Sequence, residues 1–161
     1  MRLNNKNKAG YFRFLSTLVF IISVFGATAF LLEYFIYDYL GSMQYLLIIV
    51  PVVTVLIFYW RGRQIFEYDS DGEALNFKNS NVVLFLNKSL SDEFPKYKLL
   101  AYDIINIFIL KRLYITINSK KGNIVLKYDI SYLTRKELND LKISLSKVIR
   151  NNKEQKREDI S

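Results

Sequence analysis

The sequence contains no cysteine and no histidine. Without cysteine the chain forms no disulfide and offers no thiol nucleophile, and without histidine every histidine-dependent acyl-transfer arrangement is excluded. Ordinary zinc, copper and haem sites need one of these two side chains. The sequence also lacks a P-loop, a dinucleotide fingerprint and a nucleophile elbow. We therefore predict a protein that is not an enzyme and that binds no cofactor and no metal.

Charge is missing from two long apolar segments, residues 14–32 and 43–60. A hydrocarbon core of roughly 30 Å needs about 20 helical residues, so each segment is long enough to cross a bilayer. We predict a transmembrane hairpin over residues 14–60, with helices over 14–37 and 43–60. Because neither apolar segment carries an ionisable residue at mid-depth, the hairpin is predicted to be an anchor rather than a solute pathway.

Two local features of these segments predict how the helices pack. Small residues 26–29 in the first segment allow a neighbouring helix to approach closely, and we expect that neighbour to be the second helix of the same chain. Pro51 removes one backbone donor from the second helix and is expected to kink it. Residues 27–29 also resemble the cleavage site of a secretory signal peptide. The apolar segment continues past them and is longer than the core of a usual signal peptide, so we favour the uncleaved hairpin.

Basic residues flank the hairpin, and its linker carries acids. The basic residues are Arg2, Lys6, Lys8 and Arg13 before it, and Arg61 and Arg63 after it; the acids are Glu33 and Asp38. Because Lys and Arg near the ends of transmembrane helices stay in the cytoplasm, both termini are predicted to be cytoplasmic. We expect a multi-pass protein of a bacterial cytoplasmic (inner) membrane, with residues 1–13 forming a basic N-terminal segment.

Residues 61–150 are predicted to form a cytoplasmic domain rich in β-strands, because apolar and polar residues alternate there. Asp71-Gly72 between two alternating segments predicts a β-hairpin turn. We expect seven short strands near 66–68, 75–77, 82–86, 97–101, 104–110, 113–117 and 124–128. Residues 89–95 are interpreted as a loop. The nearly continuous apolar run 104–110 is interpreted as a strand that is buried on both faces or passes beneath the membrane helices.

A C-terminal amphipathic helix is predicted from Thr134 to about Arg150. Thr134 and Glu137 form a capping box, in which each side chain accepts a hydrogen bond from the backbone N–H of the other residue. One apolar stripe follows at helical spacing and comprises Leu138, Leu141, Leu145, Val148 and Ile149. Residues 151–161 alternate charged and amide side chains and are predicted to be a disordered tail.

The element order and several strings resemble bacterial PH-like (pleckstrin-homology-like) membrane proteins with two N-terminal transmembrane helices. The strings are LLAYDIINI at 99–107, LYITIN at 113–118, KG at 121–122, YLTRKEL at 132–138 and LK at 141–142. The resemblance covers residues 11–150. It implies a membrane-anchored α+β protein in which a two-helix transmembrane hairpin precedes a seven-stranded, partly open β-barrel capped by a C-terminal helix. It implies no catalytic residue.

An acidic cluster around the Asp-Gly turn invites comparison with an EF-hand calcium loop. It comprises Glu67, Asp69, Asp71 and Glu73. With Glu67 at the first loop position, the twelfth, which should be a bidentate Glu, is Lys78, and the flanking elements are strands. We interpret the cluster as a solvated hairpin turn. In PH-like proteins that bind inositol phosphates, basic residues cluster across the first two strands, where this predicted hairpin is acidic, so we do not predict headgroup specificity.

Basic residues in the turns that bracket residues 113–118, together with those after the hairpin, are candidates for contact with anionic lipid. They are Arg61, Arg63, Lys111, Arg112, Lys120 and Lys121. Each Lys or Arg near an anionic leaflet contributes about 1 kcal/mol of attraction. Nucleic-acid binding is not predicted, because from Arg61 onward the chain has 19 Lys and Arg against 13 acids, a modest excess.

Two functions remain open from the sequence. In the first, the cytoplasmic domain is an interaction module at the membrane surface for anionic lipid or for a membrane or cytoplasmic protein, including a second copy of this chain. In the second, the protein is an accessory or assembly subunit of a larger membrane complex, and the transmembrane helices make the functional contacts.

Overall fold

The computed structural model describes residues 1–82, 88–120 and 122–158. The chain divides into two compact units. One unit is discontinuous and consists of Met1–Ala9 together with the chain from Arg63 onward; the other is the helical hairpin Gly10–Gly62. The hairpin is thus an insertion within the discontinuous domain.

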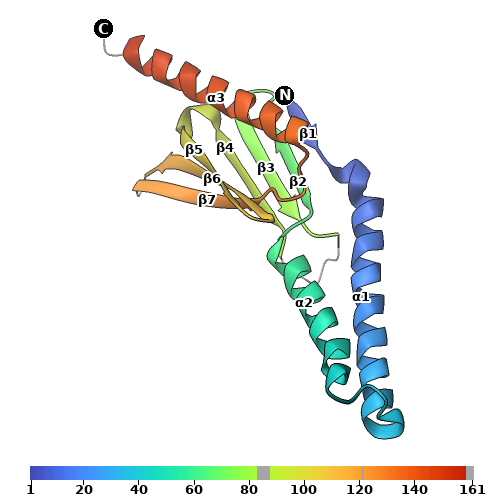
Figure 1. The fold of residues 1–161 in the computed structure, drawn as a ribbon. Helices are drawn as coiled ribbons and strands as arrows, with labels where there is room; N and C mark the ends of the chain where they lie inside the picture. The colour runs from blue at the N-terminus through green and yellow to red at the C-terminus, as the bar shows by residue number, and fades with distance from the viewer. Residues whose placement is uncertain (83–87, 121, 159–161) are drawn as a thin grey trace. The chain divides into compact units, whose positions relative to one another are not determined.

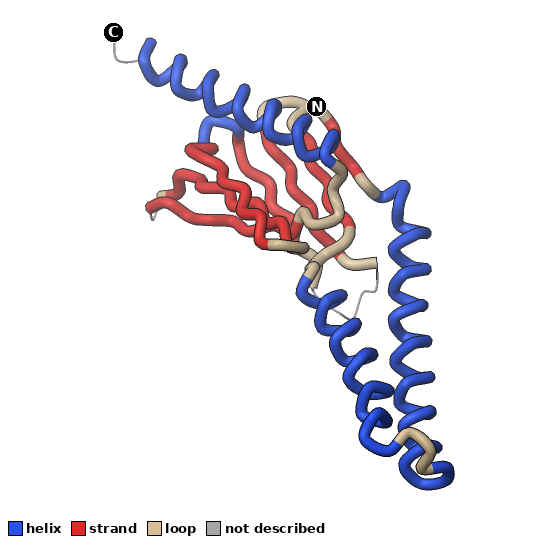
Figure 2. The backbone as a smooth tube through the Cα atoms, viewed as in Figure 1, coloured by secondary structure: helices blue, strands red, loops and turns tan. Residues whose placement is uncertain are grey.

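The hairpin is built from two long apolar helices joined by short irregular turns. Its elements are α1 Ala9–Leu32, a π-helical turn Glu33–Tyr37, a 3₁₀ turn Gly41–Tyr45 and α2 Leu46–Trp60. Figure 1 labels α1 and α2, and Figure 2 shows both helices in blue. The backbone turns at Asp38, which has a left-handed conformation and donates its N–H to the Glu33 carbonyl at 2.9 Å. The helices are long and apolar enough to cross a membrane.

The two helices approach each other closely at Gly26. A Cβ atom at this position would collide with Cγ of Pro51 and lie 2.6 Å from the Leu47 carbonyl oxygen. The predicted packing of the small-residue segment against the second helix is therefore confirmed at Gly26. The ring of Phe30 also stacks with that of Tyr34 and lies 6.3 Å from that of Tyr45, near the turn.

Polar side chains within the helices bond to their own helix, while many of the apolar side chains are exposed. Ser23 donates to the Val19 carbonyl and Thr54 to the Val50 carbonyl, each at 2.8 Å. The most apolar stretch of the first helix is 0% buried, and that of the second is 6% buried. Satisfied hydroxyls and exposed apolar side chains are what a lipid environment requires of a helix.

The discontinuous domain contains two antiparallel sheets. The first has the strand order β1-β2-β3-β4 and the second β5-β6-β7. The strands are β1 Arg2–Asn4, β2 Ile65–Asp69, β3 Ala74–Ser80, β4 Leu90–Pro95, β5 Leu99–Ile107, β6 Leu110–Ser119 and β7 Gly122–Asp129. Within the described residues the two sheets stay separate and do not close into a barrel. The strand β1 precedes the helical hairpin in the sequence, and the sequence prediction missed it.

Other strand predictions are corrected by the structure. The predicted loop 89–95 is the strand β4, whose alternation was hidden because the core-facing position 92 is an aspartate that accepts a hydrogen bond from the Tyr128 hydroxyl at 2.8 Å. The predicted strands 97–101 and 104–110 are replaced by a 3₁₀ turn, Lys96–Lys98, and the single strand β5 with a bulge near Leu99. The predicted strand 82–86 lies almost entirely outside the described residues.

The C-terminal helix α3, Arg135–Glu158, begins at the predicted capping box. The Thr134 N–H donates to Glu137 Oε2 at 2.7 Å, and the Glu137 N–H donates to Thr134 Oγ1 at 3.2 Å. The helix ends at Glu158, so the prediction of a tail that starts at residue 151 was wrong for the described part. Asn152 explains part of the extension, since its side chain donates to the carbonyls of Lys96 and Leu99 at 2.7 and 3.0 Å.

The hydrophobic core of the domain lies among both sheets and α3 (Figure 1). Aromatic rings from β2, β3, β4 and β7 form its centre, and the helix contributes its predicted apolar stripe through Leu141, Leu145 and Val148. Phe77 stacks on Phe94 and on Tyr128, with ring centroids 5.7 and 5.0 Å apart.

Candidate functional site

The chain leaves the discontinuous domain and returns to it at neighbouring points. Asn5, at the end of β1, is fully buried; its side chain donates to the Gln64 carbonyl at 2.9 Å and accepts from the Phe66 N–H at 2.8 Å. One side chain thus joins the segment that leads into α1 to the segment that follows α2. We call this region, formed by Asn5 and residues 63–65 with their contacts, the exit end of the domain.

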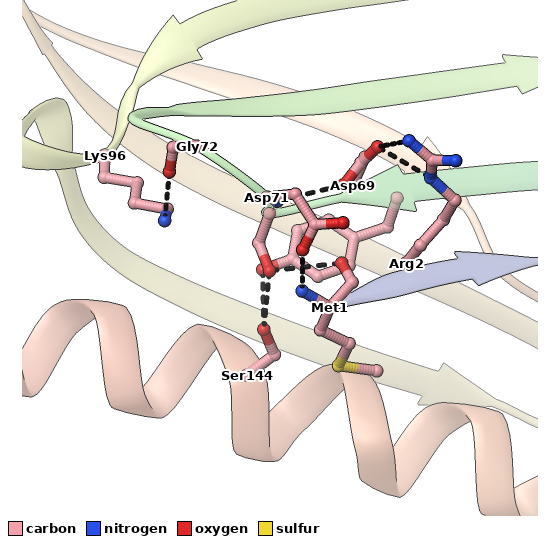
Figure 3. Close-up of polar contacts among 9 residues, drawn as sticks. Met1, Arg2, Asp69, Asp71, Gly72, Lys96 and Ser144 are labelled. Carbon is pink, nitrogen blue, oxygen red and sulfur yellow. Dashed lines mark hydrogen bonds and ion pairs between the residues drawn. The ribbon is translucent and has the colours of Figure 1, made fainter.

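Charge complementarity fixes the pairing of the N-terminal segment with the acidic hairpin. The Met1 ammonium lies 2.6 Å from Asp71, Arg2 lies 2.9 Å from Asp69, and Lys6 lies 2.8 Å from Glu67. Figure 3 shows the first two pairs. A hydrogen bond from the Asp71 N–H, and the guanidinium of Arg2, lower the pKa of Asp69.

The acidic cluster is therefore a salt-bridged hairpin turn. Gly72, with φ +68°, occupies the turn as the Asp-Gly signal predicted. Among the described residues no group of acids is arranged to hold a metal ion.

A further ion pair connects the N-terminal segment to α3. The Lys8 ammonium donates to both carboxylate oxygens of Glu137, at 2.8 and 3.0 Å. Burial raises the pKa of Glu137, but hydrogen bonds from Lys8 and Thr134 outweigh that effect and hold the pKa below its usual value. The N-terminal segment is thus fastened to the first sheet and to α3.

A buried polar group joins the two sheets at the exit end. The Asn79 side chain donates to the carbonyls of Ile65 and Asp129, at 3.0 and 3.1 Å, and accepts from the Asp129 N–H at 2.8 Å. The Asp129 carboxylate lies 3.1 Å from Nη1 of Arg63 and 3.8 Å from Nε of Arg112. These contacts bring Arg63, which follows the hairpin, against the second sheet.

The predicted lipid-contact residues fall into separate groups. Arg63 and Arg112 share Asp129 at the exit end, and Lys111 is adjacent to them because its carbonyl accepts from the Ile130 N–H at 2.9 Å. Lys120 follows the last residue of β6 and is exposed at the other end of that strand. Arg61 belongs to the helical hairpin. Lys121 lies outside the described residues.

The turn between β5 and β6 exposes an apolar group beside this cationic cluster. Ile107 pairs with Leu110, leaving Phe108 and Ile109 as a two-residue loop. Phe108 is 99% exposed and Ile107 is 60% exposed. For residues 104–110, the alternative of a strand buried on both faces was therefore wrong, and the alternative of a strand beneath the membrane helices stays a prediction. Asn106 is the only residue of a type that favours turns in this segment, which has no glycine or proline. The segment therefore resembled an uninterrupted strand.

The opposite end of the domain carries a hollow of about 680 Å³ beside α3, lined by both polar and apolar side chains. Ser144 of α3 lies 2.9 Å from the Tyr68 hydroxyl there, and Lys96 donates to the Gly72 carbonyl (Figure 3). Burial raises the pKa of Tyr68. We call this region the far end of the domain.

Comparison of the chain with family models, with curated proteins and with solved structures found no match. The functional argument therefore rests on the geometry of the exit end. Sequence reasoning missed Asn5, Asn79 and Phe108 at that end. A signal for the N-terminal strand was present, because cations at positions 2 and 6 match acids at positions 69 and 67 in antiparallel order.

Proposed function

We propose that the protein is a non-enzymatic integral membrane protein whose discontinuous domain is an interaction module at the membrane surface, for anionic lipid or a protein partner. The observation that carries the proposal is the junction at Asn5. This residue holds together the two chain segments that lead to and from the apolar helices, and this connection supports placing that end of the domain at the proposed membrane surface. Arg63, Lys111 and Arg112 lie at the same end.

A PH-like fold is part of the proposal. Among the described residues, seven strands in two antiparallel sheets, followed by one helix that packs on the core, support it. The sequence analysis placed all seven strands after the hairpin. In the structure β1 precedes the hairpin, and β2 to β7 follow it. We also propose a cytoplasmic membrane and a cytoplasmic domain, because the basic residues on both sides of the hairpin favour that orientation.

The interaction-module proposal is tested by replacing residues 10–62 with an unrelated two-helix transmembrane hairpin. Both parts of the domain, Met1–Ala9 and the chain from Arg63 onward, are kept. Proteins are then cross-linked in native membranes and recovered with the wild-type and hybrid chains. We expect the hybrid to recover the same cross-linked proteins as the wild type. Loss of all of them with a folded hybrid would contradict the proposal for a protein partner.

The lipid form of the proposal is tested with the full chain in nanodiscs that contain or lack anionic phospholipid. We expect slower amide hydrogen exchange in residues 104–112 when anionic lipid is present, and a smaller difference at high salt. Lys111→Glu should remove the difference. Lys120→Glu, at the other end of β6, is the matched control and should leave it unchanged. An exchange rate independent of lipid charge in the wild type would exclude the lipid form.

The accessory-subunit alternative is favoured by one observation in the hairpin. A cavity of about 390 Å³ opens between the two helices and is lined almost entirely by apolar atoms, including those of Ala27, Pro51 and Val55. Such a surface accepts an apolar side chain of another membrane helix. Under this alternative the hybrid with the unrelated hairpin loses the partners that the wild type recovers.

A further inference from the structure

The β5–β6 turn exposes apolar side chains where the rest of the domain buries them. Phe108 is 99% exposed and Ile107 is 60% exposed, whereas the core aromatic residues of the same domain are almost fully covered. Leaving a phenylalanine ring in water loses the favourable free energy of its burial. An exposed apolar group at the tip of a hairpin therefore calls for a second surface that covers it.

The backbone of this turn adds an independent observation. Phe108 has φ +52°, and Ile109 does not have a positive φ. In a two-residue hairpin loop, a first position with a positive φ is normally occupied by glycine, asparagine or aspartate. A bulky side chain in this conformation costs about 1–2 kcal/mol. Phe108 is thus unfavourable both for the turn and for contact with water, and its presence points to a role outside the folding of the domain.

The position of the β5–β6 turn indicates which surface covers its apolar side chains. Arg112, four residues after Phe108, shares the Asp129 carboxylate with Arg63. Arg63 follows Trp60, the last residue of α2, by three residues, which span at most about 10 Å when extended. The tip therefore lies at the end of the domain that the chain itself ties to the proposed membrane surface.

We infer that the β5–β6 turn inserts into the interface of the bilayer to which the hairpin belongs. The rings and branches of Phe108 and Ile107 enter the boundary between headgroups and acyl chains, and Lys111 and Arg112 remain at the level of the lipid phosphates. This arrangement of an apolar tip with cations behind it matches the change from hydrocarbon to anionic headgroups along the membrane normal. The inference rests on the proposed function, since it requires the exit end to face the membrane, and it names the bilayer as the ligand.

The test uses tryptophan fluorescence in the full chain. Trp60 is the sole tryptophan, so Trp60→Phe gives a dark background in which Phe108→Trp reports on the tip. The matched control is Tyr97→Trp in the same background, because Tyr97 is 67% exposed in the 3₁₀ turn at the far end. Each protein is placed in nanodiscs made with lipids brominated on the acyl chain near the headgroup, which quench tryptophan on contact.

We expect brominated lipid to quench the emission from position 108 and acrylamide, a quencher dissolved in water, to have little effect there. Position 97 should show the reverse. Equal acrylamide quenching at both positions would overturn the inference. Protection of position 108 from both quenchers would overturn it as well, because the tip would then be covered by protein. Ile107→Trp repeats the test should the first variant fold poorly.

These outcomes are distinct from failure of the proposed function. A water-exposed tip, together with partners that the hybrid chain still recovers, removes the inference and leaves the interaction module in place. A lipid-quenched tip in a hybrid that recovers none of the wild-type partners removes the protein form of the proposed function and retains the inserted tip.

Discussion

Leu3 pairs with Tyr68 in the antiparallel strands β1 and β2, although the two residues are separated in the sequence by both helices of the hairpin. Leu3 is buried in the same core as Tyr68 and the aromatic rings of β3 and β4. A residue that precedes the helical hairpin thus contributes to the core of a domain that mostly follows it. Five predictions follow from this and related contacts.

Leu3→Ala should destabilise the discontinuous domain by about 2–5 kcal/mol, because it leaves a cavity in the core. Val125→Ala, on an exposed strand position, is the control and should change stability by less than about 0.5 kcal/mol. Denaturant unfolding followed by near-ultraviolet circular dichroism measures both. Equal small effects would mean that β1 is not part of the cooperative unit.

Asn79→Ala should be strongly destabilising, because it removes hydrogen bonds from the Ile65 carbonyl and from both backbone groups of Asp129. Each unsatisfied buried group costs about 1–3 kcal/mol. Asn118→Ala, at an exposed position in β6, is the matched control. Thermal unfolding of the two variants gives the comparison, and a control that unfolds at the same temperature as Asn79→Ala would contradict the role of Asn79.

Gly26→Ala should separate the helices of the hairpin, because a Cβ atom there meets Pro51 and the Leu47 carbonyl. Overpacking of this kind costs about 1–3 kcal/mol. Gly10→Ala has nothing within 4 Å of the added atom and should be neutral or slightly stabilising. Since the chain has no cysteine, a cysteine pair introduced across the helices reports their approach by its rate of disulfide formation. That rate should fall with Gly26→Ala and remain unchanged with Gly10→Ala.

Phe108→Gly should stabilise the domain by about 1 kcal/mol, because glycine adopts the positive φ without strain. Phe108→Ala keeps the strain and removes the ring, so it should give no such gain. Chemical denaturation in detergent, where no bilayer is present, measures the difference between the two variants. An alanine variant as stable as the glycine variant would show that the turn conformation is not strained.

Acid should weaken the attachment of the N-terminal segment to α3. The pKa of Glu137 is lower in the folded protein than its usual value of 4.5, so its contribution is complete above pH 4.5 and is lost as the pH falls through the lower, folded value. Glu137→Gln removes this part of the pH dependence. Melting temperatures of both proteins between pH 6 and pH 3 test it: the difference between them should shrink as the pH falls. A constant difference across that range would contradict the assigned role of the carboxylate.

The elements that could be predicted from the sequence are those with a strong local pattern. The two apolar segments, the Asp-Gly turn and the Thr134 capping box each depend on neighbouring residues, and the structure contains all three. The helix packing at Gly26 was also predictable, because small residues next to a second apolar segment leave few other partners.

The missed features depend on partners that are remote in the sequence. β1 has three residues, too few for a local apolar pattern, and its only sequence signal is the match of the cations in and beside it to acids that lie more than sixty residues away. β4 was taken for a loop because Asp92 faces inward to accept a hydrogen bond from Tyr128, whose pKa is raised by burial and by that carboxylate. At the candidate site, the basic residues could be predicted from the sequence. The exposed turn at Phe108 could not be predicted, because an exposed apolar turn and a buried strand have the same pattern of neighbouring residues.

The position of β1 links the biogenesis of this protein to the completion of its domain. During synthesis, Leu3 is made before either apolar helix, and it can pair with Tyr68 only after both helices have been made. If only one of the two helices crossed a bilayer, the two residues would be left on opposite sides, and the first sheet would lack its edge strand. Leu3 and Tyr68 can therefore meet only when the chain enters and leaves the hairpin on the same side of any bilayer that the helices cross.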